Sequence, residues 1–161
     1  DVGRDQMNPG LRDNPRVRNF EGVNARDLDS QGFEQLVGEK VNFEIVVADL
    51  SFISLTLVME QILDVAPSAD FVLLVKPQFE VGKESLQASG VVNSHLLRAE
   101  SIRKVIDSAN GLGCGVRGLT RSSLPGTHGN IEYVVWISPR EPLNSGKWSD
   151  TIDSLAREGR E

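Results

Sequence analysis

The chain has 161 residues, with 17 Lys and Arg against 23 Asp and Glu, a formal net charge of −6 and one cysteine. This length suits one domain, and 39% apolar with 25% charged residues excludes a disordered tail. The acidic balance argues against nucleic-acid binding through charge alone. Cys114 has no partner for an internal disulfide, and no CxxC or Cys/His cluster indicates zinc, so we expect no metal and a reducing, cytoplasmic setting.

The first 42 residues predict little regular structure. The stretch from Asp1 to Pro15 is polar and turn-rich, which indicates a loop with one short helix. Val17–Val23 reads as a weak strand, and Phe33–Leu36 reads as a short helix after a polar stretch.

Two apolar runs predict the centre of a sheet. Phe43–Asp49 and Phe71–Val75 are continuous and rich in β-branched residues, which favours strands buried on both faces, as in a parallel sheet. Between them an apolar stripe of helical spacing predicts a helix, capped by Ser51 or Ser54 and stopped by Pro67. The stripe consists of Leu55, Val58, Met59, Ile62, Leu63 and Ala66.

Strands and helices continue to alternate in the second half. A polar loop over Gln78 to Val92 precedes a second amphipathic helix, which begins at Asn93 or Ser94 and ends at Gly111. The remaining expected elements are a strand at Val116–Arg121, a loop at Ser122–Asn130, a strand at Ile131–Ser138 and a helix at Trp148–Arg157. This alternation predicts a doubly wound α/β sheet with right-handed crossovers.

Charged residues stand next to three of the predicted strands. Asp49 and Lys76 follow two apolar runs, and ligands of open α/β sheets lie beyond such carboxyl ends. A structural salt bridge is the alternative for each charge taken alone. Glu132 stands at the start of the last strand, where its pattern alone indicates a surface residue. An antiparallel last strand would bring Glu132 to the same edge as the other two.

Other common sites are missing from the pattern. The sequence has neither a GxxxxGK[ST] phosphate loop nor a GxSxG nucleophile elbow. His95 and His128 are isolated, and we interpret both as non-catalytic. Trp136 and Phe71 are expected in the core. The basic run Arg12, Arg16 and Arg18 reads as a solvated face, with phosphate contact as its alternative.

Three segments carry a family resemblance. They are Val47–Leu55 (VADLSFISL), Leu73–Glu80 (LLVKPQFE) and Gly129–Trp136 (GNIEYVVW). Together with the opening DVGRDQMNPGLRDNPRV, they resemble the hemolysin A (TlyA) family of RNA ribose 2′-O-methyltransferases, which have an FtsJ-like catalytic domain. The resemblance implies a Rossmann-like sheet that uses S-adenosylmethionine and carries helices on both faces.

The resemblance assigns roles to particular residues. FtsJ-like enzymes use a Lys-Asp-Lys-Glu tetrad, and Asp49, Lys76 and Glu132 match its Asp, second Lys and Glu. Asp1 matches the acidic residue that binds the ribose hydroxyls of S-adenosylmethionine, and Asn24 matches the position near its adenine. The remaining expected cofactor contacts are Asp49 and the main chain at Leu50 and Ser51.

Parts of the family pattern do not occur in the sequence. These are the glycine-rich cofactor motif, the first Lys of the tetrad and an S4-type RNA-binding domain. We therefore expect residues 1–161 to be a partial methyltransferase domain that lacks its first two strands, with the other parts upstream.

The function implied by the resemblance is methylation of ribose 2′-hydroxyls in ribosomal RNA, with the RNA or ribosomal subunits as partners. One alternative is a non-catalytic RNA-binding or ribosome-assembly module. Another is a pore-forming hemolysin, which the lack of a membrane-length apolar segment argues against. If an RNA-binding domain lies elsewhere, this acidic chain alone should bind RNA weakly, with a shallow salt dependence.

Overall fold

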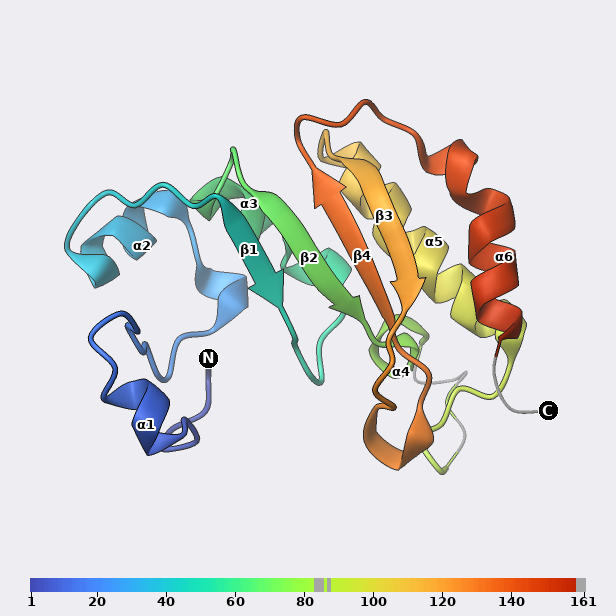
Figure 1. The fold of residues 1–161 in the computed structure, drawn as a ribbon, viewed down its shortest axis with the longest axis horizontal. Helices are drawn as coiled ribbons and strands as arrows, with labels where there is room; N and C mark the ends of the chain where they lie inside the picture. Colours follow the sequence, from blue (N-terminus) through green and yellow to red (C-terminus); the bar gives the residue numbers. More distant parts are fainter. Residues whose placement is uncertain (83–85, 87, 159–161) are drawn as a thin grey trace.

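The computed structural model describes residues 1–82, 86 and 88–158, which contain one four-stranded sheet in the order β1-β2-β4-β3 (Figure 1). β1 and β2 are parallel, whereas β4 runs antiparallel to both β2 and β3. The expected α/β class is therefore confirmed, but the sheet is mixed rather than wholly parallel. The strands are β1 (Ile45–Ala48), β2 (Asp70–Val75), β3 (Gly115–Arg121) and β4 (Tyr133–Ser138).

The helices fall where the apolar stripes predict them. The first stripe is divided between the 3-10 helix η2 (Leu55–Leu57) and α3 (Met59–Val65), and Ser54 caps η2, whereas α3 has no side-chain cap. Ser94 caps α5 (His95–Gly111), and the Ser54 and Ser94 side chains accept hydrogen bonds from the Thr56 and Leu97 amides. The α-helices are α1 (Pro9–Arg12), α2 (Ser30–Val37), α3 (Met59–Val65), α4 (Pro77–Glu80), α5 (His95–Gly111) and α6 (Ser149–Arg157). Short 3-10 helices are η1 (Ala25–Asp27), η2 (Leu55–Leu57), η4 (Thr127–Gly129) and η5 (Ser145–Trp148).

The loop expected over Gln78 to Val92 is partly helical. Its first residues belong to α4, which begins with Pro77 at a position where a helix needs no amide hydrogen. Residues 83–85 and 87 of this loop lie outside the described residues.

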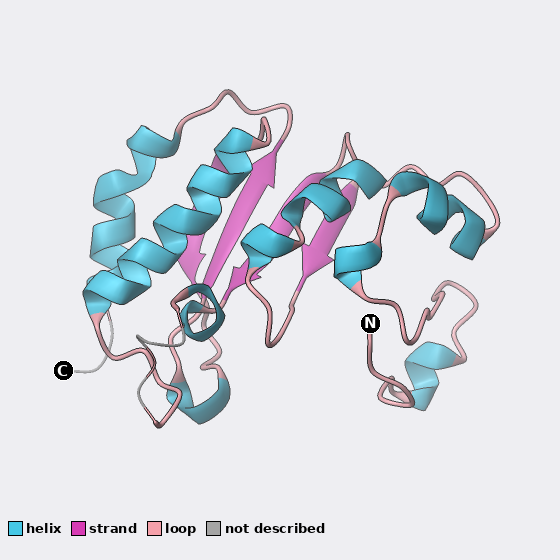
Figure 2. Cartoon of the chain, turned by 180° about the vertical axis from the view of Figure 1, so that it is seen from behind, coloured by secondary structure: helices cyan, strands magenta, loops and turns pink. Residues whose placement is uncertain are grey.

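Helices α3, α5 and α6 cover one face of the sheet (Figure 2). The expectation of helices on both faces is not met in the described part of the chain. The chain advances across the sheet in one direction from β1 to β2 and on to β3, and right-handed crossovers then place their helices on the same side.

Because one face of the sheet is uncovered, side chains of β1 and β4 on that face are more exposed than the sequence predicts. Val47 is 74% exposed and Ile45 is 57% exposed, so the prediction that the first strong strand is buried on both faces is wrong. Trp136, predicted for the core, is 38% exposed and lies 4.7 Å from the Arg117 guanidinium in a cation–π contact. β1 is also an edge strand, since β2 is its one strand partner in the described structure.

The core lies between the sheet and the three helices. Phe71, Leu73 and Val75 point from β2 into it and are fully buried, as predicted for Phe71. Other members of the core include Met59, Ile102, Val105, Ile106, Tyr133, Val135, Ile137 and Ile152.

Residues 1–44 form short helices and loops beside β1 (Figure 1). The weak strand expected at Val17–Val23 is wrong, because no described strand lies beside it to accept its backbone hydrogen bonds. The Val23 amide instead donates to the Asp1 carbonyl at 3.0 Å. Within the segment the Phe33 ring makes edge-on contacts with Phe43 and Phe20. The segment is attached to the rest of the domain where Phe43 packs against the core and where the Ser30 amide donates to Asp64 Oδ2 at 2.7 Å.

Candidate active site

Asp49 and Lys76 meet at the carboxyl ends of two neighbouring parallel strands. The register pairs Ala48 with Leu73, so the chain leaves β1 and β2 at the same edge of the sheet. Lys76 Nζ lies 2.7 Å from Asp49 Oδ1 and donates to Ser51 Oγ at 3.0 Å. The lysine side chain is 13% exposed, whereas the Asp49 side chain is 71% exposed. A largely covered ammonium is thus held beside a carboxylate that faces solvent.

Glu132 reaches the same edge from the opposite strand direction. β4 is antiparallel to β2, and Tyr133 pairs with Val75, so the residue before β4 lies beside the end of β2. Glu132 is 6% exposed, which corrects its interpretation as a surface residue. A sequence pattern could not show this burial, because it depends on the contacts that Gln78 and Gly126 make with Glu132 at the start of β4.

Two residues that the sequence analysis did not select hold Glu132 in place. Gln78 Nε2 donates to Glu132 Oε1 at 2.9 Å, and this buried amide stands two residues after Lys76. Gly126 leaves room for the carboxylate, because a Cβ there would overlap the Glu132 side chain. Gln78 therefore links the segment after β2 to the loop before β4. Its own Oε1 atom is buried and receives no hydrogen bond within the described structure.

A third buried group joins the β1 loop to the β2 loop. Glu80 accepts hydrogen bonds from Ser54 Oγ at 2.5 Å and from the Leu55 amide at 2.8 Å. Burial raises the pKa of Glu80 above its ordinary value of 4.5, against the lowering effect of these two hydrogen bonds. The motif KPQFE thus supplies Lys76 and two further residues, Gln78 and Glu80, that fix the neighbouring loops.

The expected cofactor residues form two groups. Leu50 and Ser51 directly follow Asp49, and Leu50 packs against the core. Asp1 and Asn24 lie near each other in the segment before β1, where the Asp1 carbonyl accepts from Val23 and the Asn24 side chain caps η1. In the described residues we find no hydrogen bond or ion pair between the two groups, so these cofactor assignments stay predictions.

Phe52 is a further feature of this edge that the sequence did not indicate. Its ring is 91% exposed and lies 5.2 Å from the ring centroid of Phe79. Its φ of 64° is rare for a bulky residue. Strained backbone of this kind clusters at functional sites, so it adds to the interest of the β1 loop.

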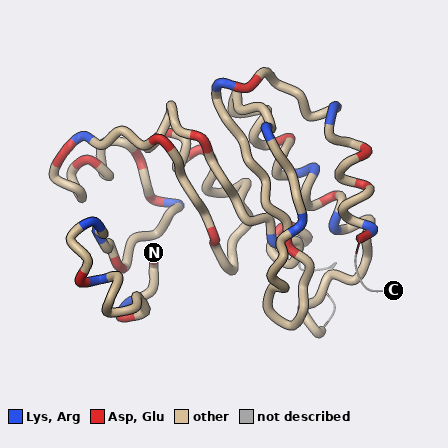
Figure 3. The backbone as a smooth tube through the Cα atoms, viewed as in Figure 1, with Lys and Arg blue, Asp and Glu red and all other residues tan. Residues whose placement is uncertain are grey.

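Other parts of the structure offer weaker sites. Acidic and basic residues are interspersed along the chain rather than separated by sign (Figure 3). Within the described ranges, no group of three His, Cys, Asp or Glu residues could hold a metal ion. None of the described helices has both the length and the apolar character of a membrane span.

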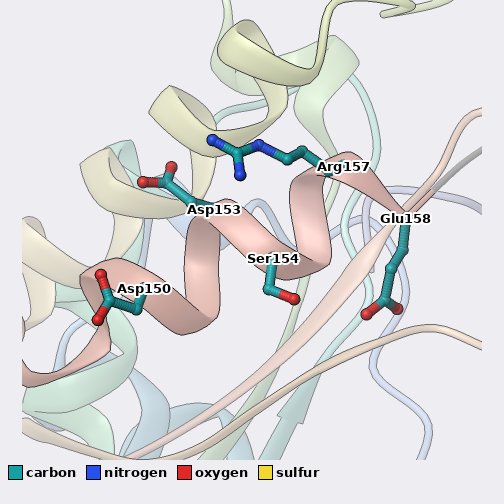
Figure 4. A pocket seen from close by; sticks show the side chains of 5 residues that line it. All are labelled: Asp150, Asp153, Ser154, Arg157 and Glu158. Atoms are coloured by element: carbon teal, nitrogen blue, oxygen red, sulfur yellow. The ribbon is translucent and has the colours of Figure 1, made fainter.

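A hollow of about 500 Å³ lies along α6, and in it the Arg157 side chain turns toward Asp153 (Figure 4). Its lining comes from residues 150–158 alone, so it belongs to a different part of the molecule from Asp49, Lys76 and Glu132.

Comparisons with known proteins show which family the chain is similar to. A family model described as FtsJ-like methyltransferase matches residues 1–138. The chain is 45% identical over 162 residues to the 16S/23S rRNA (cytidine-2′-O)-methyltransferase TlyA of Mycobacterium tuberculosis, covering 99% of this chain and 58% of that protein. It is 33% identical over 141 residues to Hemolysin A of Brachyspira hyodysenteriae, covering 83% of this chain and 54% of that protein.

A solved structure has a similar fold. The structure of a Streptococcus thermophilus protein, described as a candidate hemolysin, superposes with a TM-score of 0.84 at 30% identity. The match covers 97% of this chain and 55% of that one, so here too the chain spans little more than half the length of its relative. With a family model matched over residues 1–138, the chain belongs to the FtsJ-like methyltransferase family, and TlyA proteins are among its relatives.

Proposed function

We propose that the chain contributes to the S-adenosylmethionine-dependent methylation of ribose 2′-hydroxyls in ribosomal RNA. The observation that carries the proposal is the juxtaposition of Lys76 with Asp49 at 2.7 Å, with Glu132 at the same edge of the sheet. These residues match the Asp, the second Lys and the Glu of the catalytic tetrad in the family that the sequence resembles. The relative from M. tuberculosis is named for cytidine 2′-O-methylation of 16S and 23S rRNA, which supports RNA cytidines as the substrate.

Lys76 is the residue that we propose beside the reacting oxygen. A ribose 2′-hydroxyl is a weak acid, so negative charge develops on its oxygen as it attacks a methyl group. The Lys76 side chain, fixed by Asp49 and Ser51, is placed either to take the hydroxyl proton as general base or, as an ammonium, to stabilise that charge while the proton passes to solvent. Asp49 positions the lysine, and Glu132, held by Gln78, completes the polar frame.

The chemistry of the candidate residues fits S-adenosylmethionine in part. Its ribose hydroxyls and amino groups are donors, and Asp1, Asn24 and Asp49 offer exposed carboxylate and amide oxygens. When bound, the cofactor supplies an activated methyl group on a sulfonium. Asp1 would hold its ribose, Asn24 its adenine end, and Leu50 and Ser51 would line the pocket through their main chain.

We further propose that other segments complete the enzyme. The chain spans 58% of the length of the M. tuberculosis relative, and the resemblance assigns the glycine-rich motif, the first lysine and an S4-type domain to a segment before Asp1. The buried, unpaired Gln78 Oε1 beside Glu132 is an acceptor that such a lysine could satisfy. We also propose a cytoplasmic location, where a protein that acts on ribosomal RNA or a ribosomal subunit would meet its substrate.

The test uses the full-length protein that contains this chain. Purified ribosomal subunits are incubated with S-adenosylmethionine labelled in its methyl group, and the RNA is digested to nucleosides. We expect the label in 2′-O-methylated nucleosides. Label found on a base would contradict the assignment to the ribose, and RNA binding without any transfer would favour the non-catalytic RNA-binding module.

A further inference from the structure

A second cavity lies next to the candidate site and has a different chemical character. It has a volume of about 720 Å³ and is bounded by the loop before α5, by α5, by the end of β3 and by the loop before β4. Arg98, Arg121 and His128 are among its lining residues, as are the hydroxyl-bearing Ser89, Ser122 and Ser123. No proposed catalytic or cofactor residue lines it, so the proposed function has not yet given it a role.

The charge of this cavity departs from that of the chain. The whole chain has a net charge of −6, yet among the described residues that line the cavity none is Asp or Glu. The hollow along α6 provides a contrast, since Asp150, Asp153 and Glu158 are in its lining. A cationic cavity with hydroxyl donors fits an anion rich in oxygen acceptors, such as a phosphodiester.

The two arginines have separate tasks. Arg98 is 5% exposed, and its guanidinium donates hydrogen bonds to the Ala156, Val92 and Asn93 carbonyls. It therefore fixes the wall and adds positive charge. Arg121 is exposed, and its described hydrogen bond goes to the Glu158 carbonyl at 3.1 Å, so the guanidinium has donors to offer a ligand.

The walls of the cavity are held rigid by one buried side chain. Asn130 is 2% exposed; its Oδ1 accepts from the Val92 amide at 3.0 Å, and its Nδ2 donates to the Gly90 carbonyl at 3.0 Å. It thereby joins the loop before α5 to the loop before β4. A site whose walls are fixed before binding loses less entropy when a ligand enters.

The cavity also shares backbone with the candidate catalytic frame. Ile131 lines it and is followed by Glu132, whose carbonyl accepts from the Ser122 amide at 2.9 Å. We propose that this cavity binds a phosphodiester of the substrate RNA close to the nucleotide being methylated, with Arg121 as its principal contact. The inference rests on the proposed function for the identity of the substrate.

The first experiment measures RNA binding by the full-length protein that contains this chain, and it does not require catalysis. A short, fluorescently labelled single-stranded RNA is titrated by anisotropy at several KCl concentrations. The loss of one phosphate contact in Arg121→Gln should make the slope of log K against log salt shallower by about 0.7. The control is Arg140→Gln. Arg140 pairs with Asp70 at the start of β2 and does not line the cavity, so its loss should leave the slope unchanged.

A second variant tests the cavity by adding charge instead of removing it. Ser123 is exposed and lines the cavity, so Ser123→Asp should bind RNA several-fold more weakly at low salt, with the difference vanishing at high salt. Equal slopes for the wild type, Arg121→Gln and Arg140→Gln, together with unchanged binding by Ser123→Asp, would overturn the inference.

A third measurement separates this inference from the proposed function. In the full-length protein, Arg121→Gln should raise the KM for RNA while kcat stays near wild type. If the wild-type protein transfers no methyl group, the proposed function fails, but the salt slopes still decide whether the cavity binds RNA. If methyl transfer is normal and KM does not change, the cavity inference fails and the proposed function stands.

Discussion

Residues 1–44 and residues 45–158 are built in different ways, although one family match, over residues 1–138, includes the whole of the first part and most of the second. In the first segment Val37 is the single buried residue, and the chain is held by ring contacts, caps and surface ion pairs such as Arg18 with Glu39 at 2.7 Å. From β1 onward, a sheet and three helices enclose a continuous core. The proposed catalytic residues all belong to this second part, whereas the proposed ribose and adenine contacts, Asp1 and Asn24, belong to the first.

The part of the chain with the continuous core is the part that can hold catalytic side chains rigidly. Lys76 and Glu132 adjoin β2 and β4, whose inner side chains are fully buried, so the frame around the reacting oxygen is anchored in the core. The first segment lies beside β1, an edge strand whose outer residues are exposed. We therefore expect substitutions in the two parts to have very different effects on global stability.

The largest expected effect comes from the core of the second part. Phe71→Ala removes a fully buried ring from β2 and should lower the free energy of unfolding by about 3–5 kcal/mol. Phe33→Ala, in the half-buried ring cluster of the first part, should cost no more than about 1.5 kcal/mol. Urea unfolding measures both, and equal costs would remove the distinction between the two parts.

Gly126 tests the frame around Glu132. Gly126→Ala forces the Glu132 side chain to shift, which should cost about 1–3 kcal/mol in unfolding free energy and impair methyl transfer by the full-length protein. Gly146→Ala is the matched control, because a Cβ at Gly146 meets nothing within 4 Å. Wild-type stability and activity in Gly126→Ala would show that the position of Glu132 is not critical.

Glu80 gives a pH test of the same frame. Burial raises its pKa in the folded protein, so its protonated form favours folding and this contribution is lost as pH rises through the folded pKa. The wild type should therefore lose stability relative to Glu80→Gln as pH rises above the ordinary glutamate pKa of 4.5 and through the raised pKa of the folded protein. Exposed Glu60→Gln is the control, and parallel pH profiles of wild type and Glu80→Gln would contradict the sign.

The smallest effects on stability are expected from substituting two carboxylates with a lowered pKa, Asp70 in the second part and Glu21 in the first. A hydrogen bond from Ser138, with Arg140 and Arg117 nearby, lowers the pKa of Asp70 below 3.8, so its stabilisation exists above that pH and is lost on acidification. Asp70→Asn should cost about 1 kcal/mol at pH 7 and less below pH 3.

Glu21 is the counterpart of Asp70 in the first part. The backbone hydrogen bond from Asp5 lowers the pKa of Glu21 below 4.5. Glu21→Gln should increase amide hydrogen exchange at Asp5 and leave the urea midpoint unchanged. A shift of the midpoint as large as that of Asp70→Asn would show that the first segment unfolds together with the sheet.

Much of the second part could be predicted from sequence because its signals are local. Apolar runs and stripes gave the strands and helices, and the ends of two parallel strands brought Asp49 and Lys76 together. The open face of β1, the exposure of Trp136 and the missing strand at Val17–Val23 could not be predicted, since each depends on which elements lie alongside. The roles of Gln78 and Gly126 could not be predicted either, because each depends on a contact with Glu132, which is distant in sequence from Gln78.

The role of Lys76 in ribose methylation is tested by single-turnover methyl transfer with the full-length Lys76→Ala variant, measured at saturating cofactor and RNA. We expect the transfer rate to fall about 100-fold or more, with RNA affinity and unfolding midpoint close to wild type. Lys40→Ala, at an exposed position before β1, should transfer at the wild-type rate. A wild-type rate in Lys76→Ala would contradict the assignment of this edge of the sheet as the site of ribose methylation.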